Sequence, residues 1–223
     1  IKEDFHKEII LVNDGSLDKS KIIAINLEAK YENIILLDSI ENKGKGYAVQ
    51  LGLRMATGDL VGIFDADQEY SASDLKRLVD CIRNEDIDYV SGSRFIGNKE
   101  RINVYLRTFI ANKFLSYLFS YIYKVKITDI ATCLKVFKKD ILSDFNFEEN
   151  DFSIEVELIA KVSSKSKNYK EIPISYSGRS YEECKKIKLI DGFKYIFAIF
   201  KYKWRKVILI FQKYYFYWLS YQL

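Results

Sequence analysis

The stretch IILVNDGS, residues 9–16, joins an apolar run to a polar turn. The four apolar residues at 9–12 predict a short buried strand, and Asn13, Asp14 and Gly15 are typical turn residues. Ser16 suits the N-cap of a helix over 18–30. Because a strand, a turn and a helix in direct succession form the first half of a βαβ unit, this stretch predicts an α/β fold.

The same alternation continues along the chain. We expect further strands over 34–37, 60–64 and 89–91 and helices over 46–56, ended by Gly58, and 73–84. Each connection leaves room for one helix, which favours a doubly wound, mostly parallel sheet. We expect this domain to cover residues 1–190 and a basic, aromatic tail to cover 191–223.

Composition argues against several classes of protein. Cys81, Cys133 and Cys184 lie far apart, and His6 is the only histidine among the 223 residues. A disulfide scaffold, a zinc site and a Ser-His-Asp triad are therefore disfavoured, and the redox context is expected to be reducing. The net charge of +4 is too small to indicate nucleic-acid binding.

Polar residues follow three of the expected strands. In parallel sheets, ligands bind beyond the carboxyl ends of the strands. The sequence places Asn13 and Asp14 after the first strand, Asp65 and Asp67 after the strand over 60–64, and Arg94 after the strand over 89–91. We therefore expect a site with carboxylates from two strands and a cation from a third.

Asp65, Asp67 and Glu69 occupy alternate positions directly after a strand. In an extended chain, alternate side chains point the same way, and clustered carboxylates repel each other unless a cation lies between them. Oxygen ligands favour Mg²⁺ or Mn²⁺. The alternative is a solvated acidic turn that caps the next helix.

The loop NKGKG, residues 42–46, lacks the spacing of a P-loop and of a Rossmann turn. Two features remain for it. Gly44 permits close backbone approach, and Lys45 can face a phosphate.

Two acid-free stretches, 101–128 and 192–223, carry a concentration of bases and aromatic residues. Seven aromatic residues lie over 105–123 and twelve over 195–221. This composition favours a membrane surface, with 207–223 either interfacial or part of a span. Two packed helices with snorkelling cations are the alternative. We expect a peripheral or C-terminally anchored protein at the cytoplasmic face of a membrane, and the oligomeric state stays open.

Taken in order, the motifs resemble those of family 2 glycosyltransferases of the GT-A fold, in the polyprenyl-phosphate (dolichol-phosphate mannose synthase-like) branch. VNDGS at 12–16 resembles the family's VDDGS, NKGKGYA at 42–48 resembles its donor-side loop, and DADQEY at 65–70 is similar to its Asp-x-Asp metal motif. GSRF at 92–95, TDIATC at 128–133 and KVF at 135–137 match the acceptor half. IPI at 172–174 and GRSYEECKKI at 178–187 are similar to the closing basic segment, with Cys184 where glycine is usual.

The resemblance implies a nucleotide-sugar donor of the GDP-mannose or UDP-glucose type, a Mg²⁺ or Mn²⁺ ion and a polyprenyl-phosphate acceptor. The implied donor-binding residues are Asn13, Asp14, Gly44, Lys45 and Asp65. The implied metal ligands are Asp65, Asp67 and Glu69. The implied acceptor-phosphate ligands are Arg94, Arg107, Asp129, Arg179 and Lys185. The implied catalytic residues are Asp67, Arg94 and Arg179.

A phosphate monoester is largely a dianion at neutral pH, because its second pKa is about 6. Such an acceptor needs no general base, so we assign none, although Glu155 and Glu157 lie near the family's base position. Two simpler roles remain open: Arg107 as an anchor of its helix, and Asp129 as an N-cap or a partner of Arg94. The rival functions are a transferase with a polysaccharide or protein acceptor, and an inactive membrane-recruited paralogue.

Family members begin with one further βα unit before the strand that ends in VDDGS. Here about eight residues precede Ile9, fewer than a strand and a crossover helix need. We therefore expect an unpaired strand edge beside the strands over 9–12 and 60–64, and a chain that is unstable or deficient in donor binding as it stands.

Overall fold

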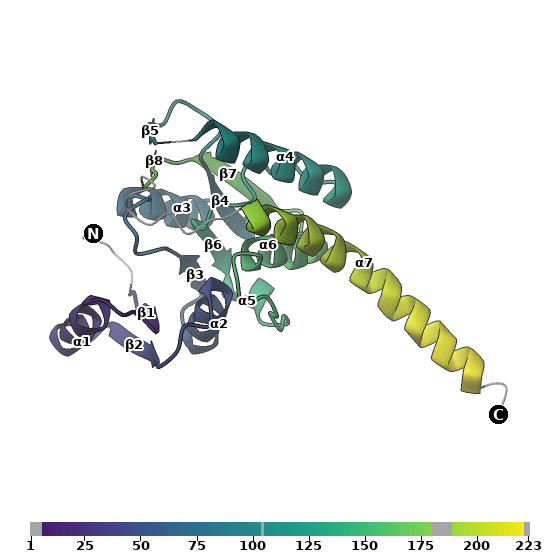
Figure 1. The fold of residues 1–223 in the computed structure, drawn as a ribbon, viewed down its shortest axis with the longest axis horizontal. Helices are drawn as coiled ribbons and strands as arrows, with labels where there is room; N and C mark the ends of the chain where they lie inside the picture. Colours follow the sequence, from purple (N-terminus) through teal and green to yellow (C-terminus); the bar gives the residue numbers. More distant parts are fainter. Residues whose placement is uncertain (1–5, 104, 180–188, 221–223) are drawn as a thin grey trace.

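The structure is a computed structural model that describes residues 6–103, 105–179 and 189–220 (Figure 1). Its N-terminal part is a βαβα unit, in which β1 and β2 pair in parallel. The elements of this unit are β1 (Ile9–Asp14), α1 (Ser20–Lys30), β2 (Ile34–Ser39) and α2 (Lys45–Met55).

The central sheet has four strands in the order β3-β6-β4-β7. These strands are β3 (Leu60–Ile63), β4 (Tyr89–Ser93), β6 (Lys135–Lys138) and β7 (Tyr169–Pro173). β4 and β7 are parallel, whereas β6 is antiparallel to both of its neighbours. A short parallel pair, β5 (Arg101–Ile102) and β8 (Tyr176–Ser177), lies beyond the end of this sheet.

Helices cover both faces of the central sheet. Successive strand residues face opposite sides, so Tyr89 and Phe137 pack into one core, with residues of α4, α6 and α7, while Val90 and Val136 pack into the other, with residues of α3. The remaining helices are α3 (Ala72–Asn84), α4 (Leu106–Tyr123), α5 (Lys139–Leu142), α6 (Ile154–Lys165) and α7 (Leu189–Ser220). The α/β fold with mostly parallel pairing is confirmed, with β6 as the antiparallel exception.

The expected elements are present with small shifts at their ends. The largest local difference concerns the first helix, which begins at Ser20 after Lys19 and not after Ser16. The side-chain oxygen of Asn13 instead accepts a hydrogen bond from the Ser16 N–H. Ser16 therefore belongs to the turn, and its expected role as N-cap is wrong. The second helix ends at Met55, three residues before Gly58.

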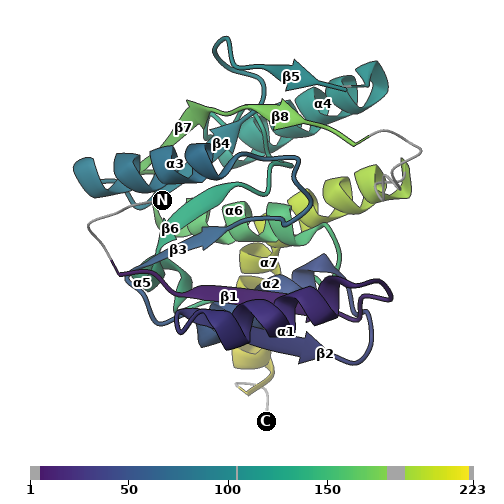
Figure 2. The same ribbon diagram turned by 90° about the vertical axis from the view of Figure 1, so that its left-hand side faces the viewer.

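The β1–β2 pair is separate from the central sheet in the described residues, although Figure 2 shows it running along the β3 side of that sheet. Within those residues, β1 pairs only with β2, and β3 only with β6. Each of these two strands thus has one edge without a partner strand among the described residues, as expected for the strands over 9–12 and 60–64.

Helix α7 crosses the boundary that the sequence suggested at residue 190. Tyr195, Ala198, Ile199 and Tyr202 lie in the core beside α4 and α6. The Tyr123 hydroxyl of α4 also donates to the Ile199 carbonyl at 3.0 Å. The first half of α7 is therefore part of the folded body, and the helix continues away from it toward the C-terminus (Figure 1).

Candidate active site

The acidic residues that follow β3 lie in a turn. Gln68 has a left-handed backbone conformation with φ of 66°, and the Glu69 N–H donates to Asp67 Oδ1 at 3.1 Å. Because the chain is not extended here, the expectation that Asp65, Asp67 and Glu69 point the same way is wrong. Asp65 pairs with Lys45, whereas Asp67 and Glu69 both pair with Arg179.

Asp67 and Glu69 share the guanidinium of Arg179. Arg179 Nη2 lies 2.9 Å from Asp67 Oδ2, and Arg179 Nε lies 3.4 Å from Glu69 Oε1. The Arg179 N–H donates to the same Glu69 oxygen at 3.1 Å, while the Tyr176 hydroxyl donates to Glu69 Oε2 at 3.0 Å. One cation therefore bridges two carboxylates at this end of the motif.

Burial raises the pKa of Asp67 above its usual value, against the Glu69 N–H, which lowers it. The negative charges of Glu69 and Asp65 raise this pKa further, and Arg179 lowers it. The ionised form of Asp67 thus depends on a nearby positive charge.

The resemblance implied that Asp65, Asp67 and Glu69 bind a divalent metal ion, and their positions allow this to be examined. Among the described residues, no group of three or more His, Cys, Asp or Glu side chains is arranged to hold a metal ion. Mg²⁺ and Mn²⁺ need only one or two carboxylates when water and substrate phosphate fill the other positions. Asp67 and Glu69 fit such an ion, because both already contact one cation. Asp65 does not share that cation.

Asp65 forms the partly exposed end of a charge network whose other members are buried. Lys45 Nζ donates to Asp65 Oδ2 at 2.6 Å and lies 2.8 Å from Glu155 Oε1, an ion pair without the alignment of a hydrogen bond. The other oxygen of Glu155 accepts from Lys135, which also donates to the Thr132 carbonyl. Two lysines and two carboxylates therefore balance their charges between α2, α6, β6 and the turn.

Burial opposes the charge of Lys45, but Glu155 and Asp65 outweigh it and raise the pKa of Lys45 well above its usual value. The Glu155 and Lys135 side chains are almost completely enclosed. Lys45 thus carries a permanent positive charge, and its ion pairs are with the protein carboxylates of Asp65 and Glu155.

Asp14 organises the loop over 42–46. Its two carboxylate oxygens accept the N–H groups of Lys43 and Gly44 at 2.8 and 2.7 Å. The neighbouring Asn13 donates to Asp38 at 2.7 Å. Both implied donor-binding side chains therefore position this part of the site through contacts within the protein.

Gly44 allows a close approach between two segments of backbone. It has φ of 101°, and a Cβ at this position would lie 2.4 Å from the Asn150 carbonyl oxygen. At Gly46, the N–H donates to that same carbonyl at 2.8 Å. The glycines thus pack the loop against residues 149–150, immediately before α6.

Arg94 is fixed by Asp129. Arg94 Nε and Nη2 donate to the two Asp129 oxygens at 2.7 and 2.8 Å, a bidentate pair that is almost completely buried. Burial opposes the charge, but Asp129 raises the pKa of Arg94 well above its usual value. Of the two roles left open for Asp129, the structure supports the partner of Arg94.

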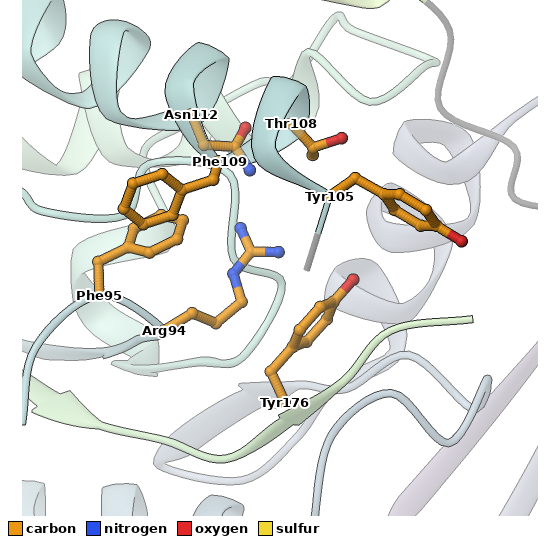
Figure 3. A pocket seen from close by; sticks show the side chains of 7 residues that line it. All are labelled: Arg94, Phe95, Tyr105, Thr108, Phe109, Asn112 and Tyr176. Atoms are coloured by element: carbon orange, nitrogen blue, oxygen red, sulfur yellow. The ribbon is translucent and has the colours of Figure 1, made fainter. Parts of the chain in front are cut away.

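A small aromatic pocket surrounds this arginine (Figure 3). The Arg94 guanidinium carbon lies 5.4 Å from the centre of the Phe95 ring and 5.0 Å from that of Tyr176. Tyr105 and Phe109, from the start of α4, line the opposite side. Because Tyr176 also contacts Glu69, the pocket adjoins the acidic turn.

Glu171 of β7 holds the backbone next to the Arg94–Asp129 pair. Its carboxylate accepts the Thr128 N–H at 2.9 Å and the Asp129 N–H at 3.3 Å. Burial raises the pKa of Glu171 to about 7, even though the backbone N–H groups lower it. Glu171 therefore holds the segment that carries Asp129.

The structure brings most of the sequence-implied residues to one edge of the fold. Arg107 is exposed in the first turn of α4, close in sequence to the pocket-lining residues. Lys185 lies outside the described residues. Sequence reasoning missed the site roles of Tyr176, Glu171 and Lys135. The charge of Lys135 in an otherwise apolar segment is the one signal that could have indicated its pairing with Glu155.

Comparison with known proteins agrees with the fold and the motifs. Residues 2–145 match the model of glycosyl transferase family 2. The chain therefore belongs to this family and is a glycosyltransferase.

The sequence is 29% identical over 223 residues to a UDP-N-acetylglucosamine–dolichyl-phosphate N-acetylglucosaminyltransferase of Methanococcus voltae, covering 91% of this chain and 88% of that one. It is 42% identical over 76 residues to a dolichyl-phosphate β-glucosyltransferase of Trichomonas vaginalis, covering 34% of this chain and 24% of the relative.

Among solved structures, the fold is similar to glucosyl-3-phosphoglycerate synthase from Mycobacterium tuberculosis in complex with Mn²⁺, UDP-glucose and phosphoglyceric acid. The TM-score is 0.64 at 15% identity, over 87% of this chain and 68% of that chain. This likeness establishes a GT-A fold.

Proposed function

We propose that this glycosyltransferase moves a sugar from a nucleotide-sugar donor to a polyprenyl phosphate at a membrane surface, with inversion at the anomeric carbon. The observation that carries the proposal is the adjacency of two centres. A pair of carboxylates suited to a divalent ion lies beside a fixed arginine, Arg94, and Tyr176 contacts both. The relatives named for dolichyl-phosphate acceptors support the same acceptor class.

Asp67 and Glu69 would hold the divalent ion, Mg²⁺ or Mn²⁺, which would neutralise charge on the departing nucleoside diphosphate. Asp14 and Lys45 keep the adjoining loop and turn in place for the donor. Arg94 and Arg179 would bind the acceptor phosphate, and Arg94 is already oriented by Asp129. A single displacement by a phosphate oxygen forms the new bond to the anomeric carbon as the bond to the diphosphate breaks, which inverts that carbon.

The environment of the two candidate bases favours a phosphate acceptor over a sugar or protein hydroxyl. Glu155 is engaged by Lys45 and Lys135. Glu157 accepts the N–H groups of residues 148 and 149 and pairs with Lys161. Neither carboxylate is placed to remove a proton from an acceptor, and a phosphate dianion does not require that step.

The membrane surface that we propose carries one apolar stripe on each of two helices. On α4, the exposed apolar side chains are Leu106, Ile110, Phe114, Tyr117 and Tyr121. On the part of α7 whose side chains are described, they are Ile190, Phe193, Phe197, Phe200 and Trp204. Their spacing of three and four residues puts each set on a single helical face.

Lys113 of α4 and Lys203 of α7 add positive charge to the same two helices, and their ammonium groups lie over the Phe95 and Tyr123 rings. Within the described residues, no helix combines the length and apolarity of a membrane span. An amphipathic surface of bases and aromatic residues suits binding to anionic lipid headgroups.

The membrane contact can be tested by replacing Phe193 and Phe197 with serine. Both side chains are 70% exposed, so the fold has little reason to change. Co-sedimentation with vesicles containing anionic lipid should fall at least severalfold, because two aromatic anchors are lost. The control is Leu17→Ser, a fully exposed apolar residue near α1. Equal losses in both variants, or none in either, would contradict a membrane role for α7.

The function can be tested by supplying labelled GDP-mannose, UDP-glucose or UDP-N-acetylglucosamine with a short polyprenyl phosphate and Mn²⁺. Transfer from one donor to the lipid, lost on removal of the metal, is the expected result. The anomeric configuration of the product reports inversion. Transfer to polysaccharide or protein but not to lipid would favour the rival acceptor.

A further inference from the structure

The position of Arg179 is the feature of this site that the proposed reaction does not explain. Its guanidinium lies against the two carboxylates suited to a divalent ion, at 2.9 Å from Asp67 and 3.4 Å from Glu69. Binding of the acceptor phosphate does not require the arginine to contact these carboxylates. The Arg179 guanidinium cannot contact the two carboxylates and the acceptor phosphate at the same time.

The backbone around Arg179 is anchored independently of its side chain. The Ser177 N–H donates to the Glu69 carbonyl and the Gly178 N–H to the Ile102 carbonyl, each at 3.0 Å. The Arg179 N–H itself bonds to the Glu69 carboxylate. The arginine is therefore delivered to the acidic turn by β8, and rotation of its side chain alone can move the guanidinium.

The guanidinium is the exchangeable partner of this group. The side chain of Arg179 is 32% exposed, whereas that of Lys45 at the other end of the motif is 15% exposed and has two carboxylate partners. Removing the guanidinium from Asp67 without a replacement would leave a partly buried carboxylate beside Glu69, which is unfavourable. A divalent ion would supply that replacement.

Charge determines where the displaced guanidinium goes. Two carboxylates and one guanidinium sum to −1, and a divalent ion in place of the guanidinium changes the sum of the remaining group to zero. The ion repels the displaced guanidinium from the turn. The nearest strong attraction for a guanidinium is then a phosphate oxygen, which arginine binds with two N–H groups.

We propose that Arg179 is the counter-ion of Asp67 and Glu69 in the free enzyme, that the divalent ion competes with it for these carboxylates, and that the released guanidinium binds the acceptor phosphate. This inference rests on the proposed function for the identity of the acceptor. It makes binding ordered, with the metal before the lipid phosphate. Such an order keeps the acceptor dianion out of a site that holds no activated donor.

The first measurement is Mn²⁺ affinity without nucleotide, by electron paramagnetic resonance of free Mn²⁺. Arg179→Gln should bind Mn²⁺ at least about fivefold more tightly than the parent, the lower end of typical coupling between competing sites. Lys170→Gln is the control, because it removes the same charge from an exposed pair with Glu85. Equal or weaker Mn²⁺ binding by Arg179→Gln would overturn the competition.

Arg179→Lys separates charge from geometry. Lysine keeps the positive charge but cannot contact two carboxylates through a planar fork. Its Mn²⁺ affinity should therefore fall between those of the parent and Arg179→Gln. Thermal unfolding of each variant, with and without Mn²⁺, checks the fold and gives a second estimate of binding, since a ligand stabilises the state that binds it. A parent stabilised by Mn²⁺ as much as Arg179→Gln would also contradict the competition.

The second measurement is binding of a short polyprenyl phosphate to the parent, by calorimetry, with and without Mn²⁺ and UDP. The proposal requires Mn²⁺ and UDP to strengthen this binding, and requires Arg179→Gln to lose the gain. Equal lipid-phosphate binding in their absence would overturn the order. If Mn²⁺ competition is observed but no sugar is transferred to the lipid, the competition stands and the proposed function fails.

Discussion

Asp65 and Asp67 lie two residues apart in one motif, yet their surroundings differ. Asp65 contacts Lys45, which a buried network with Glu155 and Lys135 holds in turn. Asp67 contacts the guanidinium of Arg179, a partly exposed side chain from the end of β8. The first contact engages Lys45, whose side chain is 15% exposed and has two carboxylate partners, whereas the second depends on the Arg179 side chain, which is 32% exposed and can rotate away.

This difference separates structural charge from functional charge. A buried ion pair is costly to break, because each partner is left uncompensated in a medium of low polarity. A partly exposed pair contributes less to stability and exchanges more easily with other ions. We infer that Asp65 keeps the turn in position and that Asp67 and Glu69 are the carboxylates available to a ligand.

The largest effect is expected at Glu155. Glu155→Ala leaves Lys135 and Lys45 without their shared partner and should reduce the free energy of unfolding by about 3–5 kcal/mol. Urea denaturation measures the change. Glu148→Ala is the control, because its pair with Arg205 is partly exposed, and it should cost less than about 1 kcal/mol. Similar losses of unfolding free energy in the two variants would show that the buried network stabilises the fold no more than a partly exposed ion pair does.

The next effect concerns ligand binding at Asp67. Asp67→Asn removes one of two carboxylates from the proposed metal position and should weaken Mn²⁺-dependent binding of the donor by about tenfold or more, which is about 1.4 kcal/mol. Calorimetry with the nucleotide, in the presence and absence of Mn²⁺, measures this. Asp86→Asn, at a 98% exposed side chain, is the control. A variant that binds the donor and responds to chelator as the parent does would exclude Asp67 as a ligand.

Substitution of Asp65 should reduce the free energy of unfolding more than substitution of Asp67, whereas ligand binding should depend more on Asp67. Asp65→Asn weakens a hydrogen bond between charged groups and should cost about 2 kcal/mol of unfolding free energy. Asp67→Asn should cost much less, because burial raises the pKa of Asp67 and the ionised carboxylate is disfavoured there. A larger loss for Asp67→Asn than for Asp65→Asn in urea denaturation would reverse the assignment of structural and functional charge.

Glu171 offers a test through pH, since it is a carboxylate with backbone N–H partners in place of a cation. Its pKa is raised from 4.5 to about 7 by burial, so folding favours its protonated form. Its stability contribution is therefore greatest below pH 4.5 and is lost as the pH rises through about 7.

Glu171→Gln removes this titration. The unfolding free energy of the parent minus that of the variant should decrease between pH 4.5 and pH 8, by up to about 3 kcal/mol at about 1.36 kcal/mol for each unit of raised pKa. Lys170→Gln on the same strand should show no such trend. A difference that is constant over this range, or that increases with pH, would contradict the raised pKa.

Much of this arrangement could be predicted from local sequence. The apolar run over 9–12 and the turn residues after it define β1, and the rule for strand ends places Asp14, Asp65 and Arg94 at one edge. The order of motifs was enough to indicate the family. These features depend on residues close together in the chain, where spacing carries the information.

The rest depends on contacts between distant residues. Arg179 lies more than 100 positions after Asp67 in the chain, and no spacing rule connects them. The turn at Gln68 has a positive φ without a glycine to mark it. The antiparallel β6, which carries Lys135 between β3 and β4, brings a charge into the core that only three-dimensional pairing with Glu155 explains.

The central claim is that an ionised phosphate is the acceptor and its own nucleophile. It is tested most directly by offering the same short prenyl chain either as a phosphate or as the free alcohol, with labelled donor and Mn²⁺, and measuring the rate of product formation. We expect transfer to the phosphate at pH 7, where it is largely a dianion, and none to the alcohol. Equal transfer to the alcohol would require a general base and would contradict the claim.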